Sequence, residues 1–252
     1  MEIAMKSHVG RVRQVNEDYY ACVTDLNGRV LAIVADGMGG HQAGDIASRL
    51  AVERIVKELR HLEGDLEAED VREQLMNAVL IANKEVYEYA VEHPECSGMG
   101  TTVVAALFDQ SSVITAHIGD SRLYFYNQED GLVMKTEDHS LVNELLKSGQ
   151  ITAEEASVHP HRNVIMRSLG TEPDVLIDLG QFEWSEGDIV LICSDGLSNK
   201  VSHPSLEENL QKQISLQAKV DGLVQEALDA GGEDNITLVA VRNTLDAGQE
   251  EG

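Results

Sequence analysis

Four aspartates occur where strand-like apolar runs end or begin, and together they could bind divalent cations. Asp36 follows LAIVA, Asp120 ends HIGD, Asp195 follows VLICS, and Asp234 precedes NITLVAV. Taken singly, each is a turn signal, because Asp readily nucleates turns. Strand ends from stacked sheets converge, however, and carboxylates gathered there raise one another's pKa unless cations compensate their charge. Oxygen ligands suit Mg²⁺ or Mn²⁺, so the sequence predicts a divalent-cation site.

The segment RQVNEDYY adds an arginine and two acids at the start of the predicted strand DYYACVT. Arg13 lies four residues before Glu17, so both side chains project to the same side of an extended chain. Glu17 and Asp18 are neighbours and point to opposite faces of a strand, so only one can face the cations. A guanidinium beside the cluster would bind a phosphate or carboxylate through two parallel hydrogen bonds. A surface salt bridge is the alternative for Arg13.

The segment DGMGGH, residues 36–41, combines the first aspartate with three glycines and a histidine. Glycine costs conformational entropy and contributes no side chain to the core. We therefore expect the backbone to be bare here, either for a tight turn or for close approach to a ligand. From its position alone, His41 is an exposed loop histidine or a neighbour of a helix N-terminus.

The elements that must position these residues come in blocks of strands and blocks of helices. Hydrophobic stripes predict a helix from about residue 43 and a second helix through residues 71–86. Strands are predicted at 18–24, 29–35, 174–182, 188–194 and 235–242, with an Asn27-Gly28 hairpin turn, a four-stranded antiparallel meander over 101–137 and a helix near 217–229. Because the two kinds of element do not alternate, we predict an α+β fold with mainly antiparallel sheets covered by helix pairs.

Composition is typical of a globular protein with one core. The chain has 252 residues, of which 42% are hydrophobic. Its net charge of -25 disfavours nucleic acids and anionic membrane surfaces as partners, since both attract Lys and Arg. No apolar run is long enough for a membrane span, and the N-terminus lacks a signal-peptide core.

Cysteine usage favours a reducing compartment. Cys22, Cys96 and Cys193 are odd in number and form no C-x-x-C pair, which indicates free thiols and a cytoplasmic location. Residues 245–252 are expected to form a polar tail. A monomer is the default expectation.

Eight short motifs carry a resemblance to a known family. In order they are RQVNED, DGMGGHQAGDIAS, SGMGTT, GDSR, DHS, RSLG, SDGL and GGEDNIT. They resemble the metal-dependent protein serine/threonine phosphatases of the 2C type, the PPM family, and most closely its bacterial branch, which is partnered with serine/threonine kinases. The resemblance runs from about residue 5 to residue 242. It implies a single catalytic domain over residues 1–244, built from two stacked antiparallel sheets flanked by antiparallel helix pairs, with a flap-like segment at about 140–170.

The same resemblance implies roles for the residues singled out above. Asp36 would bridge two Mn²⁺ or Mg²⁺ ions, of which one is completed by Asp195 and Asp234. Asp18 and the Gly37 carbonyl would serve the other ion, although alignment with the animal members places that acid at Glu17; the two alternatives stay open. Asp120, with Asp195, resembles the ligands of a third, weaker metal. Arg13 resembles the phosphate-binding arginine, and His41 resembles the proposed general acid.

The function implied is hydrolysis of phosphoserine and phosphothreonine on proteins by a hydroxide bridged between the metals, which reverses kinase signalling. A histidine with a pKa near working pH would suit protonation of the leaving alkoxide. A cysteine-based phosphatase is excluded because no H-C-x₅-R motif occurs, and a P-loop is excluded because GMGGHQAGD lacks the lysine. A catalytically silent phosphoprotein-binding module, or a hydrolase of another phosphoester, remains as the alternative.

Overall fold

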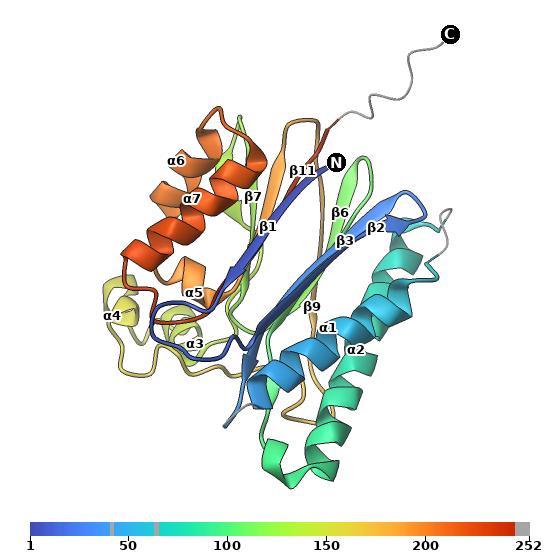
Figure 1. The fold of residues 1–252 in the computed structure, drawn as a ribbon, viewed down its shortest axis with the longest axis vertical. Helices are drawn as coiled ribbons and strands as arrows, with labels where there is room; N and C mark the ends of the chain where they lie inside the picture. The colour runs from blue at the N-terminus through green and yellow to red at the C-terminus, as the bar shows by residue number, and fades with distance from the viewer. Residues whose placement is uncertain (41–42, 63–65, 245–252) are drawn as a thin grey trace.

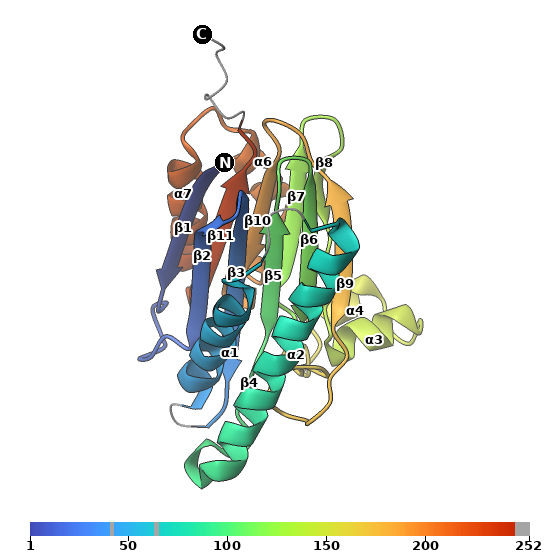
Figure 2. The same cartoon turned by 90° about the vertical axis from the view of Figure 1, so that its right-hand side faces the viewer.

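Two antiparallel sheets lie face to face between two outer layers of helices, as Figures 1 and 2 show. The computed structural model describes residues 1–40, 43–62 and 66–244. The first sheet contains β1 (Glu2–His8), β7 (Arg122–Asn127), β8 (Gly131–Met134), β10 (Ile189–Cys193) and β11 (Ile236–Arg242). The second contains β2 (Asp18–Leu26), β3 (Arg29–Met38), β4 (Gly100–Thr101), β5 (Val103–Phe108), β6 (Ser112–Ile118) and β9 (Asp178–Glu183).

The helices divide between the two outer faces. Helices α1 (Ala43–Leu59) and α2 (Ala68–Glu92) cover the second sheet, and a 3-10 turn, η1 (Pro94–Cys96), follows α2. Helices α5 (Asp195–Ser198), α6 (His203–Gln211) and α7 (Leu216–Asp229) cover the first sheet. The short helices α3 (Leu141–Lys147) and α4 (Ala153–Ser157) lie in the segment after β8, beside one end of the sheets (Figure 1). The predicted α-β-β-α sandwich is confirmed.

Strand order explains why the central strands are continuously apolar. The orders are β1-β11-β10-β7-β8 and β2-β3-β5-β6-β9, with β4 paired to β3, and all these pairs are antiparallel. In β3, Ile33 and Ala35 face the helices while Ala32 and Val34 face the opposite sheet. Successive side chains of a strand point to opposite faces. A strand between a helix layer and a sheet layer therefore buries both faces.

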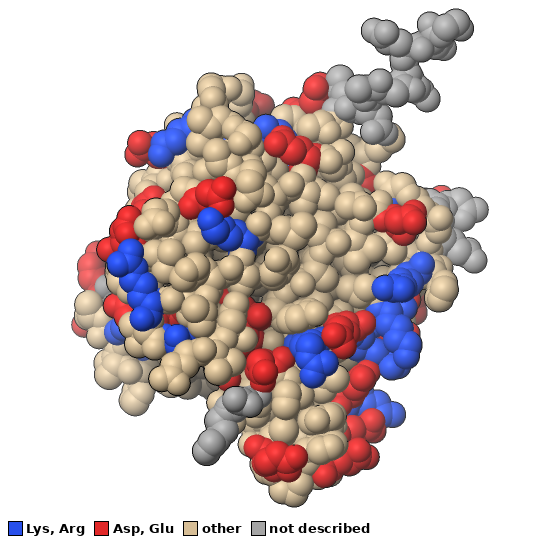
Figure 3. Space-filling model, in the orientation of Figure 1, with Lys and Arg blue, Asp and Glu red and all other residues tan. Residues whose placement is uncertain are grey.

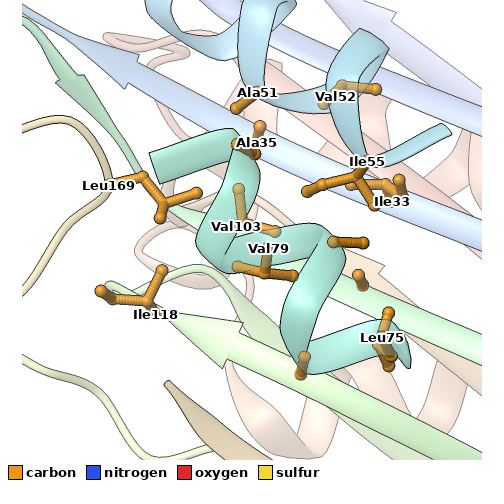
Figure 4. Close-up of a cluster of buried hydrophobic side chains, with 14 of the residues drawn as sticks. Ile33, Ala35, Ala51, Val52, Ile55, Leu75, Val79, Val103, Ile118 and Leu169 are labelled. Carbon is orange, nitrogen blue, oxygen red and sulfur yellow. The ribbon is translucent and has the colours of Figure 1, made fainter. Parts of the chain in front are cut away.

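The hydrophobic stripes predicted for the two long helices form one of the cores. In α2, Leu75 and Val79 are fully buried, and in α1, Ile55 is too. Figure 4 shows Ile55 pointing toward Ile33 of β3, and Val79 toward Val103 of β5. Ser140 caps α3, because its hydroxyl accepts a hydrogen bond from the Asn143 amide.

The predicted four-stranded meander over 101–137 is wrong. The hairpin β5-β6 belongs to one sheet and the hairpin β7-β8 to the other, and Gly119-Asp120-Ser121 carries the chain between the sheets. Gly119 has φ +107°, and a Cβ there would lie 2.5 Å from the Thr102 methyl carbon, so only glycine fits this crossing. All four strands are short apolar segments bounded by turn residues, so the pattern alone did not separate the two hairpins.

Two further elements were not predicted. Strand β1 pairs with β11 in register from Glu2 opposite Arg242 to His8 opposite Ile236, and α6 precedes the predicted helix near 217–229. The strand predicted at 174–182 is shorter and begins at Asp178. The helices of the described part of the chain include none with the length and apolar character of a membrane span.

Acidic and basic side chains are interspersed on the face drawn in Figure 3. Over α1, whose place is given by Figure 1, blue and red atoms alternate, in agreement with the ion pairs Arg49–Glu53 and Arg54–Glu58 at i,i+4 spacing. The excess of acids is therefore partly compensated locally on this face.

Candidate active site

The predicted acids meet at one end of the two sheets. Asp18 begins β2 and lies directly opposite Asp36 of β3 across the antiparallel ladder. Asp195 follows β10, Asp234 precedes β11, and Asp120 lies in the crossing between the sheets. The charges of Asp18, Asp120, Asp195 and Asp234 all act on the Asp36 carboxyl. Residues up to 216 positions apart in sequence thus form one carboxylate cluster, the acid cluster, defined by Asp18, Asp36, Asp120, Asp195 and Asp234.

Burial and mutual repulsion disfavour the ionised forms of these acids. Burial, opposed by hydrogen bonds from Ser194 and Thr237, raises the pKa of Asp18 to about 7. Burial and then the charge of Asp195 raise the pKa of Asp120 to about 7, and burial with the Asp18 charge raises the pKa of Asp36 well above its usual range. Several carboxylates in this position need positive charge to be ionised together at neutral pH.

One oxygen of the cluster has no donor among the described residues. Asp18 is 6% exposed, and its Oδ2 accepts a 2.8 Å hydrogen bond from the Ser194 hydroxyl. Its Oδ1 is buried and has no hydrogen-bond partner within residues 1–40, 43–62 and 66–244. Because a buried carboxylate oxygen without a partner is costly, this atom fits a cation ligand, bound directly or through water. A donor set made of carboxylates is also the set that Mn²⁺ and Mg²⁺ prefer.

Arg13 lies at the edge of the acid cluster. Its Nη2 donates to Asp234 Oδ2 at 2.9 Å, and its Nη1 lies 3.8 Å from Glu17 Oε2. The Arg13 side chain is 48% exposed, so the guanidinium can also reach a ligand in solvent. The predicted salt bridge of Arg13 is thus made to a member of the acid cluster.

Glu17 lies beside the acid cluster rather than inside it. Burial raises the pKa of Glu17, and the Arg13 charge opposes that rise, as does a hydrogen bond from the Gly44 amide. A Cβ on Gly44 would lie 2.5 Å from Glu17 Oε1, so the carboxyl packs against the start of α1. As predicted for strand neighbours, Glu17 and Asp18 take different directions.

Backbone packing requires the glycines that follow Asp36 and Asp195. A Cβ on Gly37 would lie 2.0 Å from the Gly44 carbonyl oxygen, and a Cβ on Gly196 would lie 1.9 Å from the Asn235 carbonyl oxygen. A tight turn or close approach to a ligand was predicted as the reason for glycine in the segment DGMGGH. The structure adds a third reason, the close approach of a strand end to a neighbouring segment of backbone.

Hydrogen bonds to the main chain fix the acids in place. The Asp36 amide donates to Thr102 Oγ1 at 2.9 Å, and its carbonyl accepts from Thr101 Oγ1 at 3.0 Å. Asn235 accepts from the Glu17 amide and donates to the carbonyls of Val9 and Val15. The loop that carries Arg13 is thereby tied to β11.

Several of these supporting residues were missed by sequence analysis. Ser194 donates to Asp18, and Asn199 donates to Asp195 Oδ2 at 3.0 Å. Asn235 and Thr102 were quoted only as parts of motifs. For Thr102, Ser194 and Asn235, membership in SGMGTT, SDGL and GGEDNIT was the available signal, because their partners are distant in the sequence. Asn199 lies outside these motifs, four residues after its partner Asp195.

A groove of about 560 Å³ lies between the acid cluster and the segment with α3 and α4. On one side it is lined by Asp120, Asp195 and Asp234, and on the other by Leu146 and residues of the loop after α4. Arg162 lines this groove, whereas Arg167 turns away from it to Asp178. His41, the predicted general acid, lies outside the described residues.

A cluster of carboxylates beside an arginine, at the end of a four-layer α-β-β-α sandwich, defines a metal-dependent hydrolase of phosphate esters. The family model "Protein phosphatase 2C" matches residues 6–230. The chain belongs to the protein phosphatase 2C family.

Individual relatives agree over nearly the whole chain. The "Serine/threonine phosphatase stp" of Listeria innocua is 40% identical over 251 residues, covering 99% of each chain. The structure of the Streptococcus agalactiae serine/threonine phosphatase has a TM-score of 0.89 at 36% identity and covers 95% of this chain and 98% of that one. The catalytic domain of the phosphatase PstP in complex with two manganese ions has a TM-score of 0.81 at 36% identity, covering 95% and 96%.

Proposed function

We propose that this chain hydrolyses phosphoserine and phosphothreonine on proteins. The observation that carries the proposal is the acid cluster, with Arg13 donating to one of its members at 2.9 Å. Family membership and relatives named serine/threonine phosphatase support the same activity. A bacterial serine/threonine kinase is the proposed opposing enzyme and is itself a proposed substrate among the phosphoproteins. The monomeric state and the cytoplasmic location are also proposals, the latter supported by the free thiols of Cys22, Cys96 and Cys193.

Two Mn²⁺ or Mg²⁺ ions are the proposed cofactors. Asp36, Asp195, Asp234 and the Gly37 carbonyl would hold the pair, with Asp120 and Asp195 available to a third ion. Of the alternatives left open, Asp18 is favoured over Glu17, because its unpartnered Oδ1 lies inside the acid cluster. The neighbour that contains two manganese ions supports a pair. When bound, the ions supply the charge that activates water and offsets a phosphate dianion.

The protein's own groups would orient the phosphate ester. Arg13 would bind two phosphate oxygens through its guanidinium, and the groove beside α3 would receive the peptide that carries the phosphate. Residues 140–170 would act as the flap of one catalytic domain over residues 1–244. The tail at 245–252 lies outside the described residues.

Phosphate release from a phosphothreonine peptide, measured with Mn²⁺ and with excess chelator, tests the proposal. Turnover in Mn²⁺ that disappears in chelator and returns when Mn²⁺ is restored is the expected result. Turnover that persists in chelator would contradict the metal-dependent mechanism. A protein that binds the peptide but releases no phosphate in excess Mn²⁺ would instead be the silent binding module.

His41 is the proposed general acid, and its role can be separated by choice of substrate. His41→Ala should lower kcat on a phosphothreonine peptide by about 100-fold, within the range for loss of a general acid. The loss on p-nitrophenyl phosphate should be much smaller, because its leaving group departs without a proton. Measured kcat values for both substrates provide the comparison. Equal losses on the two substrates would remove His41 from this role.

A further inference from the structure

A second group of titratable side chains lies behind the acid cluster, under the flap segment. His117, His139 and Asp178 each offer a potential ligand atom within 4.8 Å of the others. His117 and His139 are 6% and 5% exposed, and their rings stack with centroids 4.7 Å apart.

The hydrogen bonds of this group favour a clamp over a metal site. Asp178 accepts from Arg167 Nη2 at 2.6 Å on one oxygen and contacts His139 Nε2 at 3.2 Å through the other. The His117 Nε2 is paired with the Glu137 carbonyl at 2.9 Å. Each oxygen of the carboxylate already has a donor, and the positive charge of Arg167 beside it disfavours a cation at this place.

The other hydrogen bonds of His139 in the described part of the chain are made to the main chain of Gly119 and Met166. The Gly119 amide donates to His139 Nδ1 at 3.0 Å, and the His139 amide donates back to the Gly119 carbonyl at 2.9 Å. The His139 carbonyl accepts from the Met166 amide at 2.7 Å, at the far end of the flap segment. His139 therefore joins both ends of the flap segment to the residue that precedes Asp120.

Donor and acceptor roles fix the form of the imidazole. Because a backbone amide can only donate, His139 Nδ1 must be unprotonated, and the ring proton sits on Nε2 facing Asp178. Burial, followed by the neighbouring His117, lowers the pKa of His139, which agrees with a neutral ring. Asp178 and Arg167 thus hold the tautomer that makes Nδ1 an acceptor.

Gly119 is the part of the crossing that most needs such support. Gly119 has φ +107° and lies against Thr102, whose hydroxyl accepts a hydrogen bond from the Asp36 amide. A shift of Gly119 would move Asp120 directly.

We propose that His139 is a positioning residue that holds Asp120 in place for the cations by binding both backbone polar groups of Gly119, and that Asp178 and Arg167 orient it. This inference rests on the proposed role of Asp120 as a ligand of the third ion. The His139 side chain touches neither substrate nor cation and acts through Gly119.

Two amide variants separate the two ring nitrogens. His139→Asn places an acceptor near the position of Nδ1, whereas His139→Gln places its amide near Nε2 and leaves the Gly119 amide without a partner. In His139→Gln, hydrogen exchange of the Gly119 amide should accelerate by about tenfold, as expected for loss of one hydrogen bond. The Mn²⁺ concentration for half-maximal activity should rise by a similar factor, with kcat at saturating Mn²⁺ falling less. His139→Asn should retain Gly119 protection.

A double variant separates the clamp from the role of Asp120. In an Asp120→Asn background, His139→Gln should still expose the Gly119 amide but should not change the Mn²⁺ requirement further. Faster Gly119 exchange with an unchanged Mn²⁺ requirement in the single variant would overturn the link to the cation and leave the phosphatase proposal intact. Unchanged Gly119 exchange in His139→Gln, or equal impairment of the Asn and Gln variants, would overturn the clamp.

The unmodified protein offers an independent check, which does not depend on the variants folding. The nitrogen chemical shifts of His139 near neutral pH should show Nε2 protonated and Nδ1 unprotonated. A ring protonated on Nδ1 would be incompatible with the Gly119 hydrogen bond and would overturn the proposal.

Discussion

Asp36→Asn should lower kcat/KM for p-nitrophenyl phosphate by about 100-fold or more while the fold is retained. Charge stabilisation by a bound metal is worth several kcal/mol of barrier, and about 1.4 kcal/mol corresponds to tenfold in rate. Asp36 feels the charges of all four other members of the acid cluster. Its loss should therefore weaken the proposed cation pair more than any other single change. Steady-state kinetics over a range of Mn²⁺ concentrations give the measurement.

The fold should survive because the Asp36 main chain is held independently of the carboxyl. Thr101 and Thr102 bind its carbonyl and amide, and asparagine preserves the shape of the side chain. In chelator, the melting temperature should even rise, since one buried like charge is removed. Asp25→Asn, at the exposed far end of β2, makes the same charge change and should alter neither kcat/KM nor the melting temperature in chelator. Full activity in Asp36→Asn would contradict the proposed site.

The acid cluster could be predicted because its signals are local. Asp18 and Asp36 belong to two strands joined by the Asn27-Gly28 turn, so a hairpin brings them together, and a register shift between Val23 and Leu26 sets them directly opposite each other. Asp195 and Asp234 are each adjacent to a continuous apolar run, which marks a buried strand. Convergence at one edge then follows from the stacking of two sheets.

The crossing at Asp120 could not be predicted in the same way. Residues 119–121 separate two alternating segments, and three residues between such segments normally indicate a hairpin. The choice between a hairpin and a change of sheet depends on what packs on each face. Leu123 of β7 lies between the sheets and is paired with Ile192 of β10, 69 positions away in the sequence. No local pattern contains that information.

The supporting hydrogen bonds were missed for a related reason. Asn235 binds the carbonyl of Val9, 226 residues earlier, and Ser194 binds Asp18, 176 residues earlier. Small polar residues next to turns have many local uses, so their type carries little information about a distant partner. The gathering of the acids was therefore predictable from the sequence, and the hydrogen bonds that position them were not.

Thermal stability without cations should fall as pH rises from about 5 to about 8, and Mn²⁺ should reverse the fall. Asp18 and Asp120 have folded pKa values raised to about 7 from an ordinary value of 3.8. In that range the folded state holds protons that the unfolded state has released. The stability from these groups is therefore present at low pH and is lost as pH rises through the folded pKa. Asp36 acts in the same direction.

Cation binding should have the opposite pH dependence, because only ionised carboxylates bind the metal. At 100 times its dissociation constant, a ligand stabilises the folded state by about 2.7 kcal/mol, or roughly 5–10 °C in Tm for a domain of this size. The difference between the melting temperatures in Mn²⁺ and in chelator should therefore be much larger at pH 8 than at pH 5.5.

Asp18→Asn isolates the contribution of the acid cluster to this profile. Burial lowers the pKa of His139, so the contribution of this group to folded-state stability rises with pH. It therefore partly opposes the trend in the unmodified protein. Without the Asp18 carboxyl, the melting temperature in chelator should fall less steeply as pH rises, because one group with a raised pKa is removed. Asp25→Asn should leave the steepness of that fall unchanged. A melting temperature independent of pH in chelator, together with an equal Mn²⁺ shift at both pH values, would mean that these carboxyls ionise freely. In that case no crowding of charge would exist for the cations to relieve.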